Sequence, residues 1–407
     1  MNERPIGGME TSIIYMAREI ARLGWDVTVF NHCERPGLYD GVAYLPVEKI
    51  NAYKERHETD VFISVRYLDP FHADLNSKLK ILWTGDACDQ PFLKELGNPK
   101  VINNIHRFFV KSKWQARTTA STFNIPMEKF FVAKNGVNIE NFMDQGIERQ
   151  RAKLIYASTP FRGLDVLLEM FPQIKSRVPF AELYVFSGLA VYGISYDQEL
   201  NKYGHLYKKA LQPGVHMAGN VLQKKLRSEM MSSWLMVYPC TFPETLAGVT
   251  LEAQAAGLPV ITTNAFALPE VVKAEKTGFL IDGNPRCAEY QSRFVNKVVE
   301  LIHDERKWHT MSENAKRWIL DENTRRMAAL EWEAEFLRCL NRQNDGLILE
   351  TTQASLMDYL DRLESDPNNW QLYAKVAETC DTLGKVKDAK FFREKAVEIH
   401  SLQMQAI

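Results

Sequence analysis

Two glutamates, Glu244 and Glu252, stand eight residues apart in the segment PETLAGVTLEAQAAGLPVITT, residues 243–263. Small residues around Gly248 and the alanines after Glu252 favour a short helix, which the following Gly-Leu-Pro would end. The apolar run at the end of the segment then predicts a buried strand. The pattern therefore places Glu244 on a loop and Glu252 in the first turns of a helix, with the helix N-terminus between them.

The amide groups at that helix N-terminus lack helical partners, so this end of the helix suits a diphosphate. Two carboxylates flanking such an anion site suit a molecule with hydroxyls on both sides of a diphosphate, and a sugar nucleotide is such a molecule. A glutamate in a first helical turn is also favoured by the helix dipole without any ligand. Taken alone, the pair leaves both interpretations open.

Six further segments are ordered along residues 1 to about 340 in a way that is typical of one enzyme family. They read PIGGME (5–10), KILWTGD (80–86), FVKSKW (109–114), VAKNGVNIENF (132–142), LIYASTPFRGLDVLL (154–168) and LPEVVKAEKTGFLIDG (268–283). With the paired glutamates they resemble the retaining, nucleotide-sugar-dependent glycosyltransferases of the GT-B fold (glycosyl transferases group 1), which are similar to glycogen and sucrose synthases. The order and spacing of the segments carry this resemblance, not any single segment.

The resemblance implies roles for the acidic residues. Glu244 would hold sugar hydroxyls near the reacting carbon, and Glu252 would accept hydrogen bonds from the ribose hydroxyls. Asp86 would be the polar group on the acceptor side, next to Gly85, where the family often has a histidine. The alternative for Asp86 is a helix N-cap. Glu270 would orient neighbouring loops or start a helix after its preceding proline.

Arg162 is the cation that the resemblance places at the phosphates. It stands in a turn between a predicted strand and a helix, and a guanidinium suits phosphate. The family usually has a lysine here and an arginine a few residues earlier, where this chain has Ala157 and Ser158. The alternative is an arginine that caps a surface turn.

The diphosphate itself would be met by backbone. Gly7 and Gly8 would bring a turn of the first domain against the phosphates, needing no side chain there, or would be an ordinary flexible start. The remaining backbone positions that would line the diphosphate are Leu246, Ala247, Gly248 and Val249.

No convincing pair of metal-binding aspartates is present; Asp86 and Asp89 are the nearest, in a weak arrangement. The six cysteines are scattered, without the spacing of a zinc site. The resemblance implies a metal-free, retaining mechanism in which cationic side chains and helix N-terminal amides carry the charge. No cofactor is expected beyond the nucleotide-sugar donor.

The composition of the chain argues against some classes of binding partner and some cellular compartments. Lys and Arg total 50 and Asp and Glu total 51, which argues against a protein that holds nucleic acid by bulk charge. No apolar run reaches the roughly 18 residues that span a bilayer, and the first residues lack the apolar core of a signal peptide. We therefore expect a cytoplasmic protein with reduced thiols, at most peripheral to the inner face of the membrane.

Apolar runs alternate with helical patterns, which predicts an α/β protein with parallel sheets. We expect two doubly wound Rossmann-like domains facing a cleft, an acceptor-side domain over residues 1–145 and a nucleotide-sugar domain with a crossing-back helix over residues 146–345. The linker is expected at 144–152, and the first strand of the family is missing or nearly so. The expected strands are 26–31, 60–66, 80–84, 107–111, 129–133, 153–157, 182–187, 214–218, 234–238, 259–263 and 278–281.

The helical tail, residues 350–407, has a different pattern. Residues 366–399 resemble one complete tetratricopeptide repeat, and residues 351–364 would be the second helix of a partial one. A lone repeat cannot bury its faces, so the tail should dock on the body, self-associate or bind a protein partner. The alternative is an amphipathic hairpin that closes the flank of the enzyme.

The sequence thus predicts a hexosyltransferase that moves a sugar from a UDP- or GDP-sugar to a glycan or lipid-linked acceptor in polysaccharide assembly. One alternative is a nucleotide-sugar epimerase of the same fold, which would need catalytic carboxylates and a histidine in the cleft. The other is a non-catalytic adaptor, a degenerate transferase body whose repeat recruits partners. The changes at Gly85 and Ala157 favour the adaptor, whereas the joint presence of Glu244, Glu252 and Arg162 favours the enzyme.

Overall fold

A computed structural model describes residues 7–72, 76–143, 146–341, 356–363, 365–383 and 385–405. The chain forms two compact units. The six-stranded unit comprises Met1–Thr11, Lys111–Gln115 and Val137–Thr324, and the two-sheet unit comprises Ser12–Val110, Ala116–Gly136 and Arg325–Ile407. Residues 1–6, where the first strand of the family was expected to be missing or nearly so, lie outside the described residues, as do two residues of the expected linker and the start of the partial repeat.

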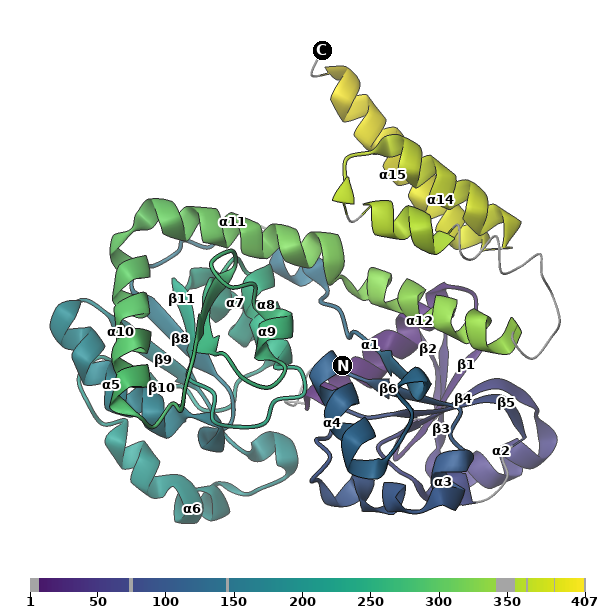
Figure 1. Cartoon of the computed structure of the whole chain (residues 1–407), viewed down its shortest axis with the longest axis horizontal. Coiled ribbons are helices and arrows are strands. Elements are labelled where there is room, and N and C mark those ends of the chain that lie inside the picture. The colour runs from purple at the N-terminus through teal and green to yellow at the C-terminus, as the bar shows by residue number, and fades with distance from the viewer. Residues whose placement is uncertain are drawn as a thin grey trace. The chain divides into compact units, whose positions relative to one another are not determined.

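The six-stranded unit is a parallel sheet with the strand order β10-β9-β8-β11-β12-β13. Its strands are β8 Lys153–Ala157, β9 Glu182–Phe186, β10 Val215–Met217, β11 Leu235–Tyr238, β12 Val260–Thr263 and β13 Gly278–Ile281. Its helices are α5 Leu164–Arg177, α6 Tyr196–Lys209, α7 Gln223–Ser232, α8 Gly248–Ala255, α9 Leu268–Val271, α10 Ala288–His303 and α11 Glu305–Glu322. Helices lie on both faces of this sheet (Figure 1).

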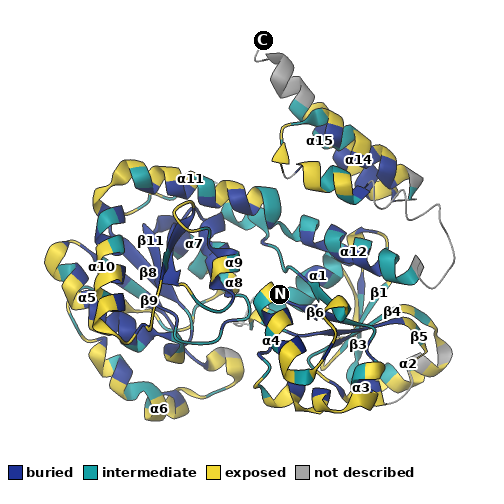
Figure 2. Cartoon of the chain, viewed as in Figure 1, coloured by how far each residue is buried: buried dark blue, intermediate teal, exposed yellow. Residues whose placement is uncertain are grey.

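Coverage of both faces explains why the strands of this sheet are continuous apolar runs. Every residue of β8, β11 and β12 is buried (Figure 2). From β8, the next two strands of the chain, β9 and β10, lie on one side in the sheet, while β11, β12 and β13 lie on the other side. The strand order therefore reverses between β8 and β11. In open α/β sheets, ligands bind outside the carboxyl ends of the strands at such a switch point.

The two-sheet unit has two sheets where one doubly wound sheet was expected. One sheet has the order β1-β3-β2 and the other the order β4-β5-β6-β7, which is parallel throughout. The strands are β1 Val27–Asn31, β2 Gly37–Tyr39, β3 Val42–Pro46, β4 Thr59–Val65, β5 Ser77–Trp83, β6 Arg107–Val110 and β7 Phe130–Val132. The helices are α1 Gly8–Arg22, α2 Ile50–Arg56, α3 Pro99–Asn103, α4 Lys113–Phe123 and α12 Arg325–Asn341. Among the described residues no strand pairs β1 with β4, so the two sheets stay separate.

The tail forms a hairpin of α14 Trp370–Thr382 and α15 Val386–Gln405, preceded by a helix over residues 356–363. Five residues at the small and apolar positions of the expected repeat are buried inside this hairpin, whereas Val386, at another such position, is 72% exposed. The five are Ala377, Cys380, Ala389, Phe392 and Ala396. Two ion pairs tie the hairpin to α12, Lys385 with Glu333 at 2.6 Å and Asp388 with Arg326. Every described helix of the protein is too short or too polar to span a bilayer.

Candidate functional site

Arg162 lies directly after the carboxyl end of β8. It closes the short 3-10 turn Pro160–Arg162, and Gly163 follows in the left-handed conformation with φ 112° as the N-cap of α5. A Cβ atom on Gly163 would stand 2.0 Å from the carbonyl oxygen of Pro239, the residue after β11. Only glycine allows this close approach, so the turn after β8 packs against the end of β11.

Glu244 lies on the loop that follows β11, and its side chain is only 6% exposed. Its Oε1 atom accepts a hydrogen bond from Nη1 of Arg162 at 2.8 Å and another from the hydroxyl of Tyr238. Its backbone carbonyl accepts from the N–H of Ala267 at 3.1 Å, which ties the loop to the one after β12. The structure thus joins Glu244 and Arg162, two residues predicted separately from segments 82 residues apart.

Burial and the charge of Glu244 together shift the pKa values of the side chains around it. Burial, the largest single influence, lowers the pKa of the Arg162 guanidinium, but the carboxylate of Glu244 and the neighbouring groups Tyr238, Tyr192 and Cys240 together outweigh it and raise the pKa above its usual value. Burial, and then the charge of Glu244, raises the pKa of Tyr238 well above its usual range and that of the Cys240 thiol to about 12. Arg162 is therefore a permanent cation, while Tyr238 and Cys240 stay protonated at neutral pH.

Helix α8 begins at Gly248, four residues after Glu244, as the sequence predicts. Its N-cap, Ala247, has φ 34° and ψ 61°, a left-handed conformation that alanine adopts reluctantly. Gly248 is exposed, and a Cβ atom added to it would meet nothing within 4 Å. Since the first amides of a helix have no intrahelical acceptors, those of Gly248 and Val249 present an anion-binding end beside an open space.

Glu252 is half-buried on the second turn of α8. The helix itself is held by Gln254, whose Nε2 donates to the carbonyl oxygens of Thr250 at 2.9 Å and Val271 at 2.8 Å. After Ala255 the chain reverses at Gly257, with φ 75°, and enters β12. The predicted loop, helix and strand are therefore present, and they carry Glu244 and Glu252 on one rigid segment.

Gly7 and Gly8 lie at the start of α1, in residues assigned to the six-stranded unit. The Gly7 carbonyl accepts from the backbone N–H of Thr11 at 3.0 Å and from its hydroxyl at 2.8 Å. A Cβ atom on Gly7 would stand 2.3 Å from a carboxylate oxygen of Glu10. That oxygen is the end of an exposed, flexible side chain that can move away, and a Cβ atom on Gly8 would meet nothing within 4 Å, so contacts in this turn do not require glycine.

Asp86 lies in the two-sheet unit, after β5, and is 9% exposed. Arg66 contacts both of its oxygens, with Nη2 to Oδ1 and Nε to Oδ2 each at 3.0 Å. Thr84 donates its hydroxyl to Oδ2 at 3.2 Å and accepts the backbone N–H of Asp86 at 3.0 Å. The sequence analysis missed Arg66, since partners that stand 20 positions apart in the chain give no periodic signal of contact.

Glu270 orients a neighbouring segment, as one interpretation of its sequence expected. Its carboxylate accepts the backbone N–H groups of Lys113 at 2.8 Å and Trp114 at 2.7 Å, the first amides of α4. These residues belong to the same unit as Glu270. Glu270 is therefore committed to capping a helix.

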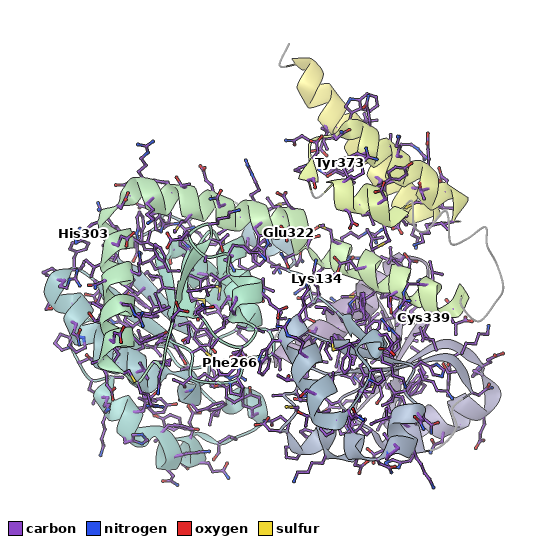
Figure 3. The ribbon with its side chains drawn as sticks, viewed as in Figure 1. Lys134, Phe266, His303, Glu322, Cys339 and Tyr373 are labelled. Atoms are coloured by element: carbon purple, nitrogen blue, oxygen red, sulfur yellow. The ribbon has the colours of Figure 1, made fainter. Side chains whose placement is uncertain are left out.

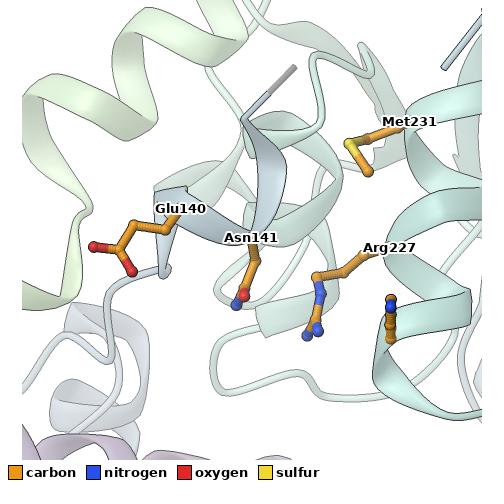
Figure 4. A pocket seen from close by; sticks show the side chains of 5 residues that line it. Glu140, Asn141, Arg227 and Met231 are labelled. Carbon is orange, nitrogen blue, oxygen red and sulfur yellow. The ribbon is translucent and has the colours of Figure 1, made fainter. Parts of the chain in front are cut away.

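A second polar feature lies away from the predicted residues. A pocket of about 240 Å³ is lined by Glu140 and Asn141 on one side and by Lys224, Arg227 and Met231 of α7 on the other (Figure 4). Across the described residues, no three His, Cys, Asp or Glu side chains converge in a way that would hold a metal ion.

Comparison with known protein families gives a match in the six-stranded unit. Residues 139–318 match the Glycosyl transferases group 1 family, so this part of the chain is similar to the domain of that family. It contains the whole six-stranded sheet together with Arg162, Glu244 and Glu252.

A 178-residue stretch is 29% identical to the GDP-mannose-dependent alpha-(1-6)-phosphatidylinositol monomannoside mannosyltransferase of Mycobacterium tuberculosis. The match covers 42% of this chain and 43% of the relative, so the chain spans less than half the length of that protein. Over 83% of its length this chain is similar in fold to sucrose-phosphate synthase from Thermosynechococcus elongatus, with TM-score 0.65 and 14% identity, and the likeness covers 94% of that protein. It is also similar to HepE of Anabaena, solved with UDP and glucose, with TM-score 0.60 and 16% identity over 83% and 98%. These likenesses show that the chain has the GT-B fold.

Proposed function

We propose that this protein is a glycosyltransferase that moves a hexosyl group from a nucleotide-sugar donor to a glycan or lipid-linked acceptor. The observation that carries the proposal is the ion pair of Arg162 and Glu244. It joins the loops after β8 and β11, the two strands between which the strand order reverses. Its carboxylate, Glu244, stands four residues before the N-terminus of α8. Cation, carboxylate and helix amides are what a sugar diphosphate requires at a switch point.

The pair has a geometry suited to two tasks. Both hydrogen bonds from Arg162 and Tyr238 fall on Oε1 of Glu244, so Oε2 is the oxygen that would accept from a hydroxyl of the donor sugar. A guanidinium carries five N–H donors in a planar fork, so Arg162 can keep Glu244 in place and still meet a phosphate. The side chain of Arg162 is 23% exposed, which gives a ligand access to it.

The charge of the leaving group would be met without a metal ion. The first amides of α8, at Gly248 and Val249, and the positive end of the helix dipole would stabilise the diphosphate together with Arg162. The acceptor hydroxyl oxygen forms a bond to the anomeric carbon as the bond from that carbon to the diphosphate oxygen breaks. The hydroxyl proton passes to the departing phosphate oxygen, and the nucleoside diphosphate leaves. Attack on the face from which the diphosphate departs would retain the configuration.

Four further residues have proposed roles. Glu252 would accept hydrogen bonds from the ribose hydroxyls, and the Gly7-Gly8 turn would approach the phosphates with its backbone. Asp86, held by Arg66, would face the acceptor. The mannosyltransferase relative depends on GDP-mannose and HepE was solved with UDP and glucose, so the names of these proteins support a nucleotide sugar while differing in the base.

The decisive experiment measures release of nucleoside diphosphate from a panel of UDP- and GDP-sugars, with and without chelator. We expect at least one donor to be turned over, chelator to have no effect, and Glu244→Ala to abolish turnover. Glu182→Ala is the matched control, since Glu182 also pairs with a cation, Lys175, but lies at the amino end of β9. Equal turnover in the Glu244→Ala and Glu182→Ala variants would refute the proposal.

A non-catalytic adaptor is the second candidate, and one observation favours it. Helix α15 exposes Val386, Phe391 and Val397 on the surface of the docked hairpin, which suits contact with a protein partner. The adaptor function would be supported if no donor in the panel were turned over while the folded protein still bound a nucleoside diphosphate.

A further inference from the structure

A pocket of about 380 Å³ opens in the six-stranded unit over the carboxyl ends of three strands. It is lined by residues that end or directly follow β11, β12 and β13, among them Thr241, Thr263, Phe266, Asn284 and Arg286. In the strand order it lies on the opposite side of β11 from β8, but it borders the turn that carries Arg162, since Thr241 donates its hydroxyl to the Phe161 carbonyl at 3.5 Å and Arg286 pairs with Asp165 at the start of α5. None of the residues assigned above to the donor lines it. Its volume falls in the range of small-molecule sites, roughly 300–1,000 Å³.

Phe266 gives this pocket an aromatic wall at a cost in backbone strain. Its φ is 58°, in the left-handed region that a bulky residue adopts only when its surroundings enforce it. Trp114 packs edge-on against the ring, with centroids 5.6 Å apart and planes at 78°. The next residue, Ala267, is held by its N–H bond to the Glu244 carbonyl. Phe266 is half-buried on the loop after β12 (Figure 3), so the strain places a large aromatic side chain where a glycine would be relaxed.

The rim of the pocket is polar but carries no uncompensated charge. The guanidinium of Arg286 is paired with Asp165. The hydroxyl of Thr263 is already engaged by the Cys240 carbonyl at 2.9 Å and by Tyr290 at 2.8 Å. Asn284 accepts the backbone N–H of Arg286 through Oδ1 at 3.0 Å, which orients its amide NH2 group as a donor.

A phosphate or carboxylate would have to share Arg286 with Asp165, so the charge at the rim gives no net preference for an anion. A purely apolar ligand would give the amide NH2 group of Asn284 no acceptor, whereas the hydroxyl of Thr241 already donates to the Phe161 carbonyl. A pyranose ring satisfies both requirements: its C–H face can lie on an aromatic ring, and its hydroxyls can exchange hydrogen bonds with side chains at the edge. We propose that this pocket binds a neutral pyranose unit of the acceptor, stacked on Phe266 and hydrogen-bonded at Asn284. Its assignment to the acceptor rests on the proposed function; the binding of a neutral saccharide does not.

The test titrates the full-length protein with neutral disaccharides (maltose, cellobiose, lactose and mannobiose) and follows binding by saturation-transfer NMR. We expect at least one of them to bind, and Phe266→Gly to weaken it at least fivefold. Glycine suits the left-handed φ at this position, so this substitution removes the ring while relieving the backbone, and the variant should fold. Phe180→Ala, which removes an exposed phenylalanine elsewhere in the unit, should leave the affinity unchanged.

Two further variants separate this subsite from the donor site. Glu244→Ala should leave disaccharide binding intact, because the carboxylate does not line the pocket. If Glu244→Ala abolished binding while Phe266→Gly did not, the saccharide would occupy the donor site and the inference would be wrong. It would also be wrong if no disaccharide bound, or if inorganic phosphate bound in its place and was lost in Arg286→Gln. Binding that depends on Phe266 in a protein that turns over no donor would refute the proposed function and leave the saccharide subsite standing.

Discussion

Two buried carboxylates, Glu244 in the six-stranded unit and Glu333 in the two-sheet unit, have nearly the same set of partners and yet differ in what surrounds them. Glu244 is bound by a guanidinium and by the hydroxyl of Tyr238. Glu333 is bound by the ammonium of Lys385 at 2.6 Å and by the indole N–H of Trp25 at 2.9 Å. The side chains of Glu244 and Glu333 are 6% and 4% exposed.

The difference lies in the cation and its place in the fold. Lys385 is 6% exposed and sits between α14 and α15, so the pair with Glu333 is sealed on both sides and ties the tail to α12. Arg162 is 23% exposed at the carboxyl edge of a parallel sheet, beside a helix N-terminus. A buried ion pair is therefore a weak sign of function on its own, because structural pairs have the same contacts. The Arg162–Glu244 pair differs from the Lys385–Glu333 pair in that its cation is accessible to a ligand and lies at the switch point of the sheet.

The largest expected effect falls on the sealed pair. Lys385→Ala leaves Glu333 buried without its cation, which should lower the free energy of unfolding by about 3–5 kcal/mol. The measurement is urea unfolding followed by tryptophan fluorescence. Lys390→Ala is the control; its side chain is 76% exposed, and its removal should change the free energy of unfolding by less than about 0.5 kcal/mol. Equal unfolding curves for the two variants would show that the tail is not anchored through Lys385.

Substitution in the solvent-accessible pair of Arg162 and Glu244, here called the open pair, should change donor turnover more than stability. Arg162→Ala should lower donor turnover by about 100- to 1,000-fold, since it removes a cation from the developing charge of the diphosphate. Arg162→Lys should recover only part of this, because one ammonium cannot serve Glu244 and a phosphate in the fixed fork geometry of a guanidinium. Arg151→Ala, at an arginine of the same unit that is 44% exposed, is the control for the steady-state assay. Full activity in Arg162→Ala would place this pair in the same class as Glu333 and Lys385.

The elements of the six-stranded unit could be predicted from the sequence because each buried parallel strand is an uninterrupted apolar run. All six expected strands of this sheet are present within one or two residues. Strands β2 and β3 were missed, since every residue of β2 is exposed and its apolar pattern is weak. The one local signal for this hairpin is the turn at Asp40 and Gly41, with φ 51° and 81°. An Asp-Gly pair is a strong hairpin marker, and it was not used.

The site was predicted as separate residues and not as a cluster. Motif spacing found Arg162 and Glu244, but their contact depends on β8 and β11 being neighbours in the sheet, which no local pattern encodes. Tyr238 was taken for an ordinary strand residue, although its hydroxyl donates to Glu244. The left-handed φ of Phe266 also has no sequence signal, because the residue type argues against it. Contacts and strain of this kind are set by tertiary packing.

A smaller effect is expected at Glu252, which lies beyond the ion pair on α8. Glu252→Ala should weaken binding of the donor nucleotide by about 1–3 kcal/mol, through the loss of its hydrogen bonds to the ribose. Isothermal titration calorimetry with UDP and GDP measures this directly. Glu289→Ala, at a side chain that is 83% exposed on α10, should bind like the native protein. If Glu252→Ala bound the nucleotide as tightly as the native protein, Glu252 would not belong to the donor site, and Glu244 and Arg162 would be its remaining charged residues.

The smallest effect concerns Glu229, the carboxylate of a third pair, which lies in the same unit as Glu244 but away from the switch point. Lys153 and Lys225 bind it at 2.7 Å and 2.6 Å. Burial alone would raise the pKa of Glu229, but these hydrogen bonds outweigh burial and lower it. Because its pKa is lower folded than unfolded, the pair stabilises the protein above the unfolded pKa of about 4.3, and this contribution is lost as pH falls through the folded pKa. Glu229→Gln should therefore lower the free energy of unfolding by about 1 kcal/mol at pH 7 and by nothing once both forms are protonated.

Urea unfolding of Glu229→Gln and the native protein across this pH range measures the difference between them. Donor turnover per folded molecule should stay the same, since Lys153 and its partner lie at the amino end of β8. A loss of turnover at neutral pH in Glu229→Gln would mean that a pair remote from the carboxyl edge also contributes to the reaction. Position at that edge would then no longer separate the open pair from the sealed one.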